Sequence, residues 1–319
     1  MTRCSSITDS TPAALARAVR LLRAGKVVAF PTETVYGLGA DATNDEAVAS
    51  IFAAKGRPQF NPLIVHVTDA AAAERFGVLD ERARKLTAAF WPGPLTIVVP
   101  RVKDCGVSWL ATAGLETIAL RSPGHRIAQD LLTAFGGPIA APSANRSGNV
   151  SSTTADHVAE SLGEAVELIL DGGPTVHGLE STIVGLAGAE ATLLRPGAIT
   201  RAEIEEVIGP LGVAHDDADA PHSPGRLKRH YATATRLRLD ATAVGADEGL
   251  LAFGPPLPGA ARTLNLSPSG NLKEAAANLF AMLRALDLWG LPVIAVMPVP
   301  ATGLGEAIND RLQRAAMRE

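Results

Sequence analysis

Cysteine is almost absent from the 319-residue chain, and its two cysteines, Cys4 and Cys105, lie far apart in the sequence. A structural zinc site needs a cluster of ligands, and the disulfide framework of a small secreted protein needs more cysteines. The segment from Met1 to Thr11 lacks the apolar core of a signal peptide. We therefore expect a protein of the reducing cytoplasm.

Long hydrophobic runs and an excess of one charge are also missing. The longest apolar stretch, Leu288 to Thr302, contains three prolines and is shorter than the roughly 20 residues that a membrane helix needs. We therefore expect no membrane association. The net charge of −4, from 29 basic and 33 acidic residues, argues against a general polyanion binder but leaves room for a local basic pocket. We expect no stable nucleic-acid complex.

The familiar nucleotide-binding signatures are absent or incomplete. There is no G-x-x-x-x-G-K-[ST] phosphate loop. Residues 37–42 match G-x-G-x-x-A, but they begin seven residues after an expected strand that ends at Phe30, and no acidic residue closes a second strand as a dinucleotide site requires. The segment Gly303-Leu304-Gly305 lacks the third glycine. We interpret both as glycines at turns and helix starts.

Short β-rich runs alternate with amphipathic segments along the whole chain, which predicts an α/β fold. The chain is 47% hydrophobic and 19% charged, as a globular protein is. In the first two thirds, the expected strands are 27–30, 62–67, 95–99, 117–121, 139–141, 168–170, 182–184 and 192–195. The expected helices there are 12–24, 45–54, 126–135 and 154–162.

The amino-acid composition changes near Ile208, where Gly, Pro, Asp and His become frequent. We expect a first domain at 1–208, a linker at 209–235 and a small second α/β domain at 236–319, because a connection of this length exceeds the usual ~4–6 residues within a domain. The second domain is expected to have strands at 237–239, 250–253, 263–266 and 293–297, and helices at 272–287 and 304–317.

The first motif that could take part in catalysis or binding is Lys55-Gly56-Arg57, at the end of an expected helix. In a turn, a lysine and an arginine two positions apart can converge on one polyphosphate. Alternatively, both cations neutralise the helix dipole and face solvent. Asn61 offers an amide nearby, and His66 lies on the next expected strand, where a buried polar group needs a partner.

Two further polar clusters follow expected strands. Residues 141–148 (Ala-Pro-Ser-Ala-Asn-Arg-Ser-Gly) form a loop in which a ligand can approach backbone N–H groups. Alternatively, they are the stretch before a helix that begins near Thr154. Residues 31–37 (Pro-Thr-Glu-Thr-Val-Tyr-Gly) place two threonines and a carboxylate where they could recognise a small polar ligand. The alternative there is ordinary turn chemistry.

Taken in order, these segments resemble the threonylcarbamoyl-AMP synthase family in its two-domain form, over nearly the whole chain. Each motif is weak alone, but the ordered set is specific. The matching segments are 30–39, 55–57, 61–66, 91–96, 120–123, 142–145, 147–148, 181–184, 195–197, 223–225, 229–232, 303–308 and 310–312. One departure is Arg226-Leu227-Lys228, where the family commonly has a methionine followed by a basic and an aromatic residue.

The resemblance implies a twisted, open-sheet YrdC-like domain with a concave substrate face, and a smaller Rossmann-like C-terminal domain. The linker would lie across the active site. The implied activity is synthesis of threonylcarbamoyl-AMP from L-threonine, bicarbonate and ATP with release of pyrophosphate, with Mg²⁺ accompanying ATP. A transiently bound tRNA threonylcarbamoyl-transferase would then move the group to adenosine beside the anticodon.

The resemblance also implies site residues, with no protein ligand for a metal. Lys55 and Arg57 would be catalytic. The threonine would be held by Thr34, His66, Arg121 and Ser181. The ATP contacts would be Lys55, Arg57, Asn61, Thr117, Ala141, Ser143, Ser151, Arg195 and Tyr231. Glu33 and Glu180 could act directly or only brace loops.

Two other functions are open at this point. A carbamoyl-transfer module of the hydrogenase-maturation kind shares the first domain, but it would carry paired C-x-x-C zinc fingers that two isolated cysteines cannot supply. An RNA-binding translation regulator would need a basic stripe, which the acidic net charge disfavours.

Overall fold

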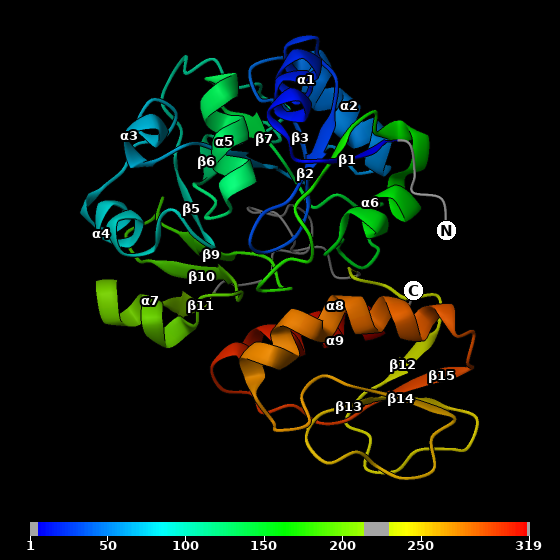
Figure 1. The fold of residues 1–319 in the computed structure, drawn as a ribbon. Coiled ribbons are helices and arrows are strands. Elements are labelled where there is room, and N and C mark those ends of the chain that lie inside the picture. The colour runs from blue at the N-terminus through cyan, green and yellow to red at the C-terminus, as the bar shows by residue number, and fades with distance from the viewer. Residues whose placement is uncertain (1–5, 214–229, 318–319) are drawn as a thin grey trace.

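In a computed structural model of the chain, which describes residues 6–213 and 230–317, two α/β units form around two separate sheets (Figure 1). The large unit contains strands β1 Ile7–Asp9, β2 Val28–Phe30, β3 Gly37–Asp41, β4 Ile64–His66, β5 Leu95–Pro100, β6 Thr117–Arg121, β7 Ile139–Ala140, β8 Ile169–Asp171, β9 Thr182–Gly185, β10 Thr192–Arg195 and β11 Gly212–Val213. Its helices are α1 Pro12–Arg23, α2 Asp45–Lys55, α3 Ala70–Ala73, α4 Glu81–Phe90, α5 Arg126–Phe135, α6 Ala155–Leu162 and α7 Arg201–Ile208. The predicted α/β class is confirmed.

The large sheet is mixed. Its strand order over the described residues is β1-β8-β2-β3-β7-β4-β6-β5-β9-β10-β11. The pairs β4–β6 and β5–β9 are parallel, whereas β5–β6 and β4–β7 are antiparallel. This order brings β4, β6, β5 and β9 side by side although β9 begins 118 residues after β4 begins, counted from Ile64 to Thr182.

Residues 37–41, which we expected at a turn or helix start, instead form strand β3 between β2 and β7. Glycine is needed there for packing rather than for a turn. A Cβ on Gly39 would lie 2.7 Å from the Phe30 ring and 2.9 Å from Ile139 Cγ2. The glycines suggested a turn because the close packing on Gly39 depends in part on β7, which is about 100 residues away in sequence and which no local pattern reveals.

Helix α2 positions the basic turn. The Asn44 side chain caps its first turn by accepting from the N–H groups of Glu46 and Ala47. The helix ends at Gly56, whose φ of 59° is left-handed, so the chain turns away before Arg57. The two side chains on either side of Gly56 therefore have different partners: Lys55 bonds to the backbone of Ser143, and Arg57 bonds to that of Pro62.

Different helices pack on the two faces of the large sheet, and each face receives alternate residues of every strand because successive side chains point to opposite sides. Ala29, Val65 and Leu120 belong to the core that also contains residues of α2, α4 and α6. On the other face, Val28 and Phe30 pack with α1 and α5. Further along that face, a small separate apolar cluster of Ile64, Val98, Ala119 and Ile183 lies on β4, β5, β6 and β9. The candidate site lies on this part of the face, because Ile64 lines it.

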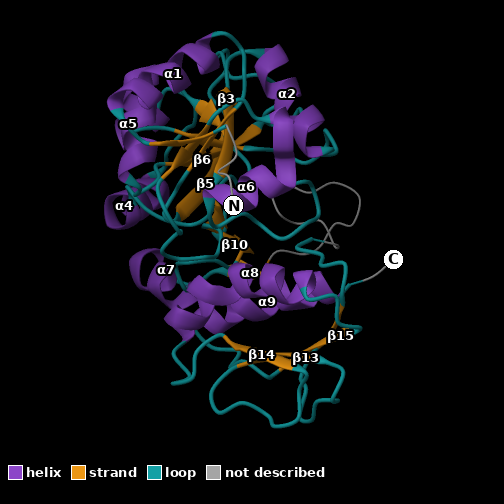
Figure 2. Ribbon diagram, turned by 45° about the vertical axis from the view of Figure 1, so that its right-hand side comes forward, coloured by secondary structure: helices purple, strands orange, loops and turns teal. Residues whose placement is uncertain are grey.

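The small unit has an all-parallel sheet in the order β12-β15-β13-β14. Its elements are β12 Arg236–Arg238, β13 Gly249–Ala252, β14 Arg262–Asn265, α8 Leu272–Leu288, β15 Val293–Val296 and α9 Leu304–Ala316. The predicted second α/β domain is thus confirmed. In both Figure 1 and Figure 2, α8 and α9 lie between this sheet and the large unit.

The contact between the two units is apolar and close. Val35, Val150 and Leu179 of the large unit join the core of the small one, together with residues of α8 and α9. A Cβ on Gly178 would lie 2.3 Å from the backbone oxygen of Ala277 on α8. The segment before β9 therefore packs directly on a helix of the small unit.

No helix in the described ranges is long and apolar enough to cross a membrane. Most of the expected linker, including the departure Arg226-Leu227-Lys228, lies outside the described residues.

Candidate active site

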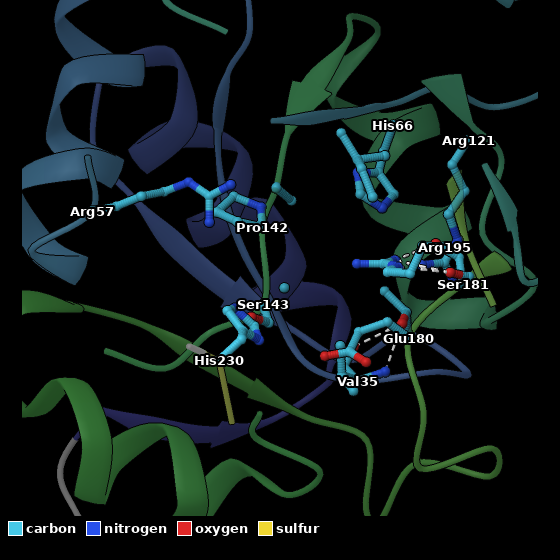
Figure 3. A pocket seen from close by; sticks show the side chains of 14 residues that line it. Val35, Arg57, His66, Arg121, Pro142, Ser143, Glu180, Ser181, Arg195 and His230 are labelled. Atoms are coloured by element: carbon cyan, nitrogen blue, oxygen red, sulfur yellow. Dashed lines mark hydrogen bonds between the residues drawn. The ribbon is translucent and has the colours of Figure 1, made fainter. Parts of the chain in front are cut away.

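A pocket lies over the face of the large sheet that carries Ile64, and the side chains around it come from distant parts of the sequence (Figure 3). Arg57 lies at one side of the view, and His66, Arg121, Ser181 and Arg195 lie at the other. The lining residues are Thr32, Val35, Gly37, Arg57, Ile64, His66, Arg121, Ala141, Pro142, Ser143, Glu180, Ser181, Arg195 and His230.

Arg121 is held by a carboxylate and a hydroxyl from the loop after β2. Its Nη2 donates to Glu33 Oε1 at 2.7 Å and to Thr34 Oγ1 at 2.9 Å. The other Glu33 oxygen accepts from the Gly124 backbone N–H at 2.9 Å. Burial opposes ionisation of Glu33, but the adjacent Arg121 guanidinium outweighs it and lowers the pKa of the carboxyl. Glu33 thus stays charged and fixes the orientation of Arg121.

The turn after α2 is buried, so the solvent-facing alternative for its two cations is wrong. Arg57 donates from Nε to the Asn61 backbone oxygen at 3.3 Å and from Nη2 to that of Pro62 at 2.9 Å. Lys55 Nζ donates to the backbone oxygens of Ser143 and Asn145. Arg57 lines the pocket, whereas Lys55 braces the loop beside it.

The start of β9 is held by an arginine from β10. Arg195 donates to the Ser181 backbone oxygen, at 2.9 Å from Nη2, and to Ser181 Oγ at 3.1 Å. The same hydroxyl lies 2.8 Å from Thr96 Oγ1. Ser181 is completely buried and lines the pocket. Its hydroxyl is therefore a fixed polar group on the wall that also contains Arg121.

The described linker residue that lines the pocket is His230, not Tyr231. Tyr231 has a φ of 63° and stacks on Phe280 of α8, with ring centroids 5.2 Å apart. Its hydroxyl is buried and has no hydrogen-bond partner among the described residues. The structure thus places Tyr231 in the core of the small unit, while its neighbour lines the site.

Burial and clustered positive charge dominate the electrostatics. Burial, reinforced by Arg195, lowers the pKa of Arg57 to about 9, so Arg57 remains charged at neutral pH although the two guanidinium groups disfavour each other's charge. Burial and then Arg121 lower the pKa of His66 to about 3. His66 is therefore neutral, and its Nδ1 is buried without a partner among the described residues. An anion between the arginines would relieve their repulsion.

The expected site residues divide into three groups. Those that line the pocket are Arg57, His66, Arg121, Ala141, Ser143, Ser181 and Arg195. Those that touch a lining residue through a hydrogen bond are Thr34, Lys55, Asn61 and Ser151. The remaining two, Thr117 and Tyr231, do neither. Thr117 is on the same face of β6 as Arg121, but it lies at the other end of the strand, opposite Pro100.

Seven lining residues were not among the expected ligands, and three of them, Thr32, Glu180 and His230, have polar side chains that could contact a substrate. Thr32 lies within the 31–37 motif and His230 within the matching segment 229–232, but neither was assigned a ligand role. Glu180 was noted, but its role was open. Its carboxylate accepts from Ser151 Oγ at 2.7 Å, which no local pattern indicates because the two residues are 29 positions apart.

No group of three or more His, Cys, Asp or Glu side chains in the described parts of the chain could hold a metal ion. The two buried carboxylates near the pocket, Glu33 and Glu180, are each paired with an arginine.

Comparison with known proteins gives matches over nearly the whole chain. A family model described as "Telomere recombination" matches residues 20–197, and one described as "Threonylcarbamoyl-AMP synthase, C-terminal domain" matches residues 199–317. The threonylcarbamoyl-AMP synthase of Bacillus subtilis is 42% identical over 95% of this chain and 92% of its own length. That of Pyrococcus abyssi is 41% identical over 94% and 93%.

The fold of both units also matches a solved structure. A crystal structure of P. abyssi Sua5 complexed with L-threonine superposes with a TM-score of 0.88 at 39% identity, covering 95% of this chain and 94% of that one.

Proposed function

The chain belongs to the threonylcarbamoyl-AMP synthase family, and we propose that its pocket condenses L-threonine, bicarbonate and ATP into threonylcarbamoyl-AMP, with release of pyrophosphate. The main supporting observation is that three buried arginines, Arg57, Arg121 and Arg195, line one pocket. Every substrate carries at least one anionic group, so catalysis here is mainly positioning and charge neutralisation. The match to a synthase-specific C-terminal domain favours this function over a carbamoyl-transfer module.

The reaction proceeds in two steps without a covalent protein intermediate. The neutral amine of threonine attacks the carbon of bicarbonate, and loss of water gives N-carboxythreonine. An oxygen of the new carboxylate then attacks the α-phosphorus of ATP, and the bond to the β-phosphate breaks to release pyrophosphate. Both reactants of the second step are negative, and the buried cations offset their repulsion.

The threonine end of the pocket is the wall with Arg121. Its guanidinium, oriented by Glu33, would pair with the threonine carboxylate. The Thr34 and Ser181 hydroxyls are within hydrogen-bond distance of Arg121 and Arg195 respectively, so they flank this position. Neutral His66 can accept a hydrogen bond at Nδ1 from the threonine side chain or amine.

The nucleotide end is the wall with Arg57. Arg57 would bind the phosphates, with Arg195 approaching them from the opposite wall (Figure 3). The Asn61 amide is fully buried, and both of its polar atoms lack a partner among the described residues, which suits a ligand contact. The Ser143 loop and Ser151 complete this end, whereas Thr117 and Tyr231 lie away from the pocket and are not contacts in this proposal. Magnesium would enter as the ATP complex, bound by phosphate oxygens.

The product is a reactive mixed anhydride that needs an acceptor. We propose that it passes to a threonylcarbamoyl-transferase acting on tRNA, through a transient contact in the cytoplasm.

Pyrophosphate release tests the assignment directly. The purified protein with Mg·ATP should release pyrophosphate only when L-threonine and bicarbonate are both present, and omission of either should reduce the rate to background. Release that continues without threonine would contradict the proposed function, and replacement of L-threonine by L-valine controls for a general amino-acid effect.

A further inference from the structure

Glu180 connects the pocket to the small unit through its two carboxylate oxygens. One oxygen accepts from Ser151 Oγ at 2.7 Å, and the other accepts from Arg311 Nε of α9 at 3.0 Å. Glu180 lines the pocket, and Ser151 is completely buried beside it. The carboxylate is therefore shared between a residue of the large unit and one of the small unit.

Arg311 is the largest fully buried side chain among the described residues. Its Nη1 pairs with Asp310 at 2.7 Å, and its Cζ lies 5.4 Å from the centroid of the Tyr231 ring. Its Nη2 is buried with no hydrogen-bond partner among the described residues. A buried guanidinium contributes little net stability, since replacing such an ion pair with well-packed apolar residues often leaves the free energy of unfolding unchanged. This burial suggests a role beyond packing.

A second arginine of the small unit holds the backbone at and beside Ser151. Arg284 of α8 donates from Nη2 to the Val150 backbone oxygen and from Nε to that of Ser151 at 3.3 Å. Its Nη2 also lies 3.4 Å from Ser152 Oγ. The backbone of Ser151 is thus held by α8, and its side chain is held through Glu180 by α9.

We infer that Arg311 is a positioning residue for the ATP end of the pocket, acting on Ser151 through Glu180. The small domain then contributes to nucleotide binding indirectly, besides holding the chain at Tyr231. The inference rests on the proposed role of Ser151 as an ATP contact.

A second ion pair between the two units serves as a control for any general weakening of the domain interface. Arg201 of α7 pairs with Glu306 of α9 at 3.1 Å, which is also an ion pair between the two units. Neither residue lines the pocket or bonds to a residue that does. Loss of this pair weakens the interface without disturbing Glu180.

The experiment compares Arg311→Met, Glu180→Gln, the double variant and Arg201→Ala by steady-state pyrophosphate release, with ATP and L-threonine varied separately. Because hydrogen bonds to charged groups are the stronger ones, we expect Arg311→Met to raise the KM for ATP about tenfold. The KM for threonine should stay within about twofold in the same variant. The double variant should be no worse than the poorer single variant, because both changes remove one interaction.

Two variants separate this positioning role from a weaker domain interface and from a simple loss of charge. Arg201→Ala should leave both KM values within about twofold of the parent, as expected for a partly exposed ion pair. Arg311→Lys keeps the positive charge, so it should retain more ATP affinity than Arg311→Met. If Arg311→Met does not fold, the double variant, which leaves no unpaired buried charge from this pair, gives the same comparison against Glu180→Gln.

The inference is overturned if Arg311→Met changes the two KM values equally, if it behaves like Arg201→Ala, or if the two single effects multiply in the double variant. These outcomes differ from a failure of the proposed function, in which the parent protein itself would show no release dependent on threonine and bicarbonate.

Discussion

The Lys55 ammonium donates a 2.6 Å hydrogen bond to the backbone oxygen of Ser143, a residue 88 positions further along the chain. It also donates to the Asn145 backbone oxygen, and the Ser147 N–H donates back to the Lys55 backbone oxygen at 2.8 Å. The end of α2 and the 141–148 loop are therefore fastened in both directions. Lys55 holds one wall of the pocket in place.

Replacement of this lysine should affect stability as well as activity. Lys55→Met removes a donor from the buried Asn145 carbonyl oxygen and one of two donors from that of Ser143, so we expect the free energy of unfolding to fall by about 1–3 kcal/mol. Urea denaturation measures this change. Lys85→Met is a control at an exposed position, expected to change stability by less than about 0.5 kcal/mol. An unchanged unfolding midpoint in Lys55→Met would indicate that the lysine serves only the phosphates.

Arg57→Ala should separate activity from folding. Because its guanidinium lines the pocket, its loss should reduce pyrophosphate release by roughly 100-fold or more, as loss of a key electrostatic contact does in other enzymes. Circular dichroism should show a retained fold. Arg84→Ala, at an exposed ion pair with Glu74, should leave turnover normal. Normal turnover in Arg57→Ala would remove this residue from the site.

His66 should make stability depend on pH. Its pKa is about 3 in the folded protein but about 6.5 in an unfolded chain. Above pH 6.5 neither state binds the proton and the stability is fully present. As the pH falls below 6.5, only the unfolded state becomes protonated, so stability decreases by about 1.4 kcal/mol per pH unit for this histidine.

Urea titrations between pH 7.5 and 5.5 test this effect, because that window lies above the range in which Glu180 contributes. Burial opposes ionisation of Glu180, but Arg311 and Arg195 outweigh it and lower the pKa of the carboxyl to about 2. Its stabilisation is therefore lost only as the pH falls below about 4.5. The His66→Gln variant should show a shallower dependence on pH than the parent. Parallel slopes would mean that His66 does not titrate in this way.

Gly39→Ala should destabilise the large sheet. The new methyl group would lie 2.7 Å from the Phe30 ring and 2.9 Å from Ile139, and overpacking of this kind costs about 1–3 kcal/mol. In Gly188→Ala, the nearest atom to the new methyl group is 3.9 Å away, so this variant is a matched control. Thermal melts of the two variants compare them directly, and equal melting temperatures would contradict the packing argument.

Local sequence patterns determined much of the secondary structure. The strand at 117–121 and the helix at 126–135 have the predicted bounds, and the strands of the small domain begin and end within one residue of their predicted positions. These segments combine a clear apolar pattern with strong end signals, such as the left-handed Gly136 after α5. The ordered set of motifs also identified the family, because the order of motifs along the chain can be read from the sequence without knowledge of the fold.

Only the tertiary structure decided which polar groups meet. The sequence indicated that Lys55 and Arg57 are important, but not that the first braces a loop while the second lines the pocket. Strand β3 and the ion pair of Glu180 with Arg311, 131 positions apart, were likewise hidden. The reason is physical: periodicity and capping depend on neighbours within a few residues, whereas burial, charge pairing and close packing depend on which distant segments the sheet order and the docking of the two domains bring together.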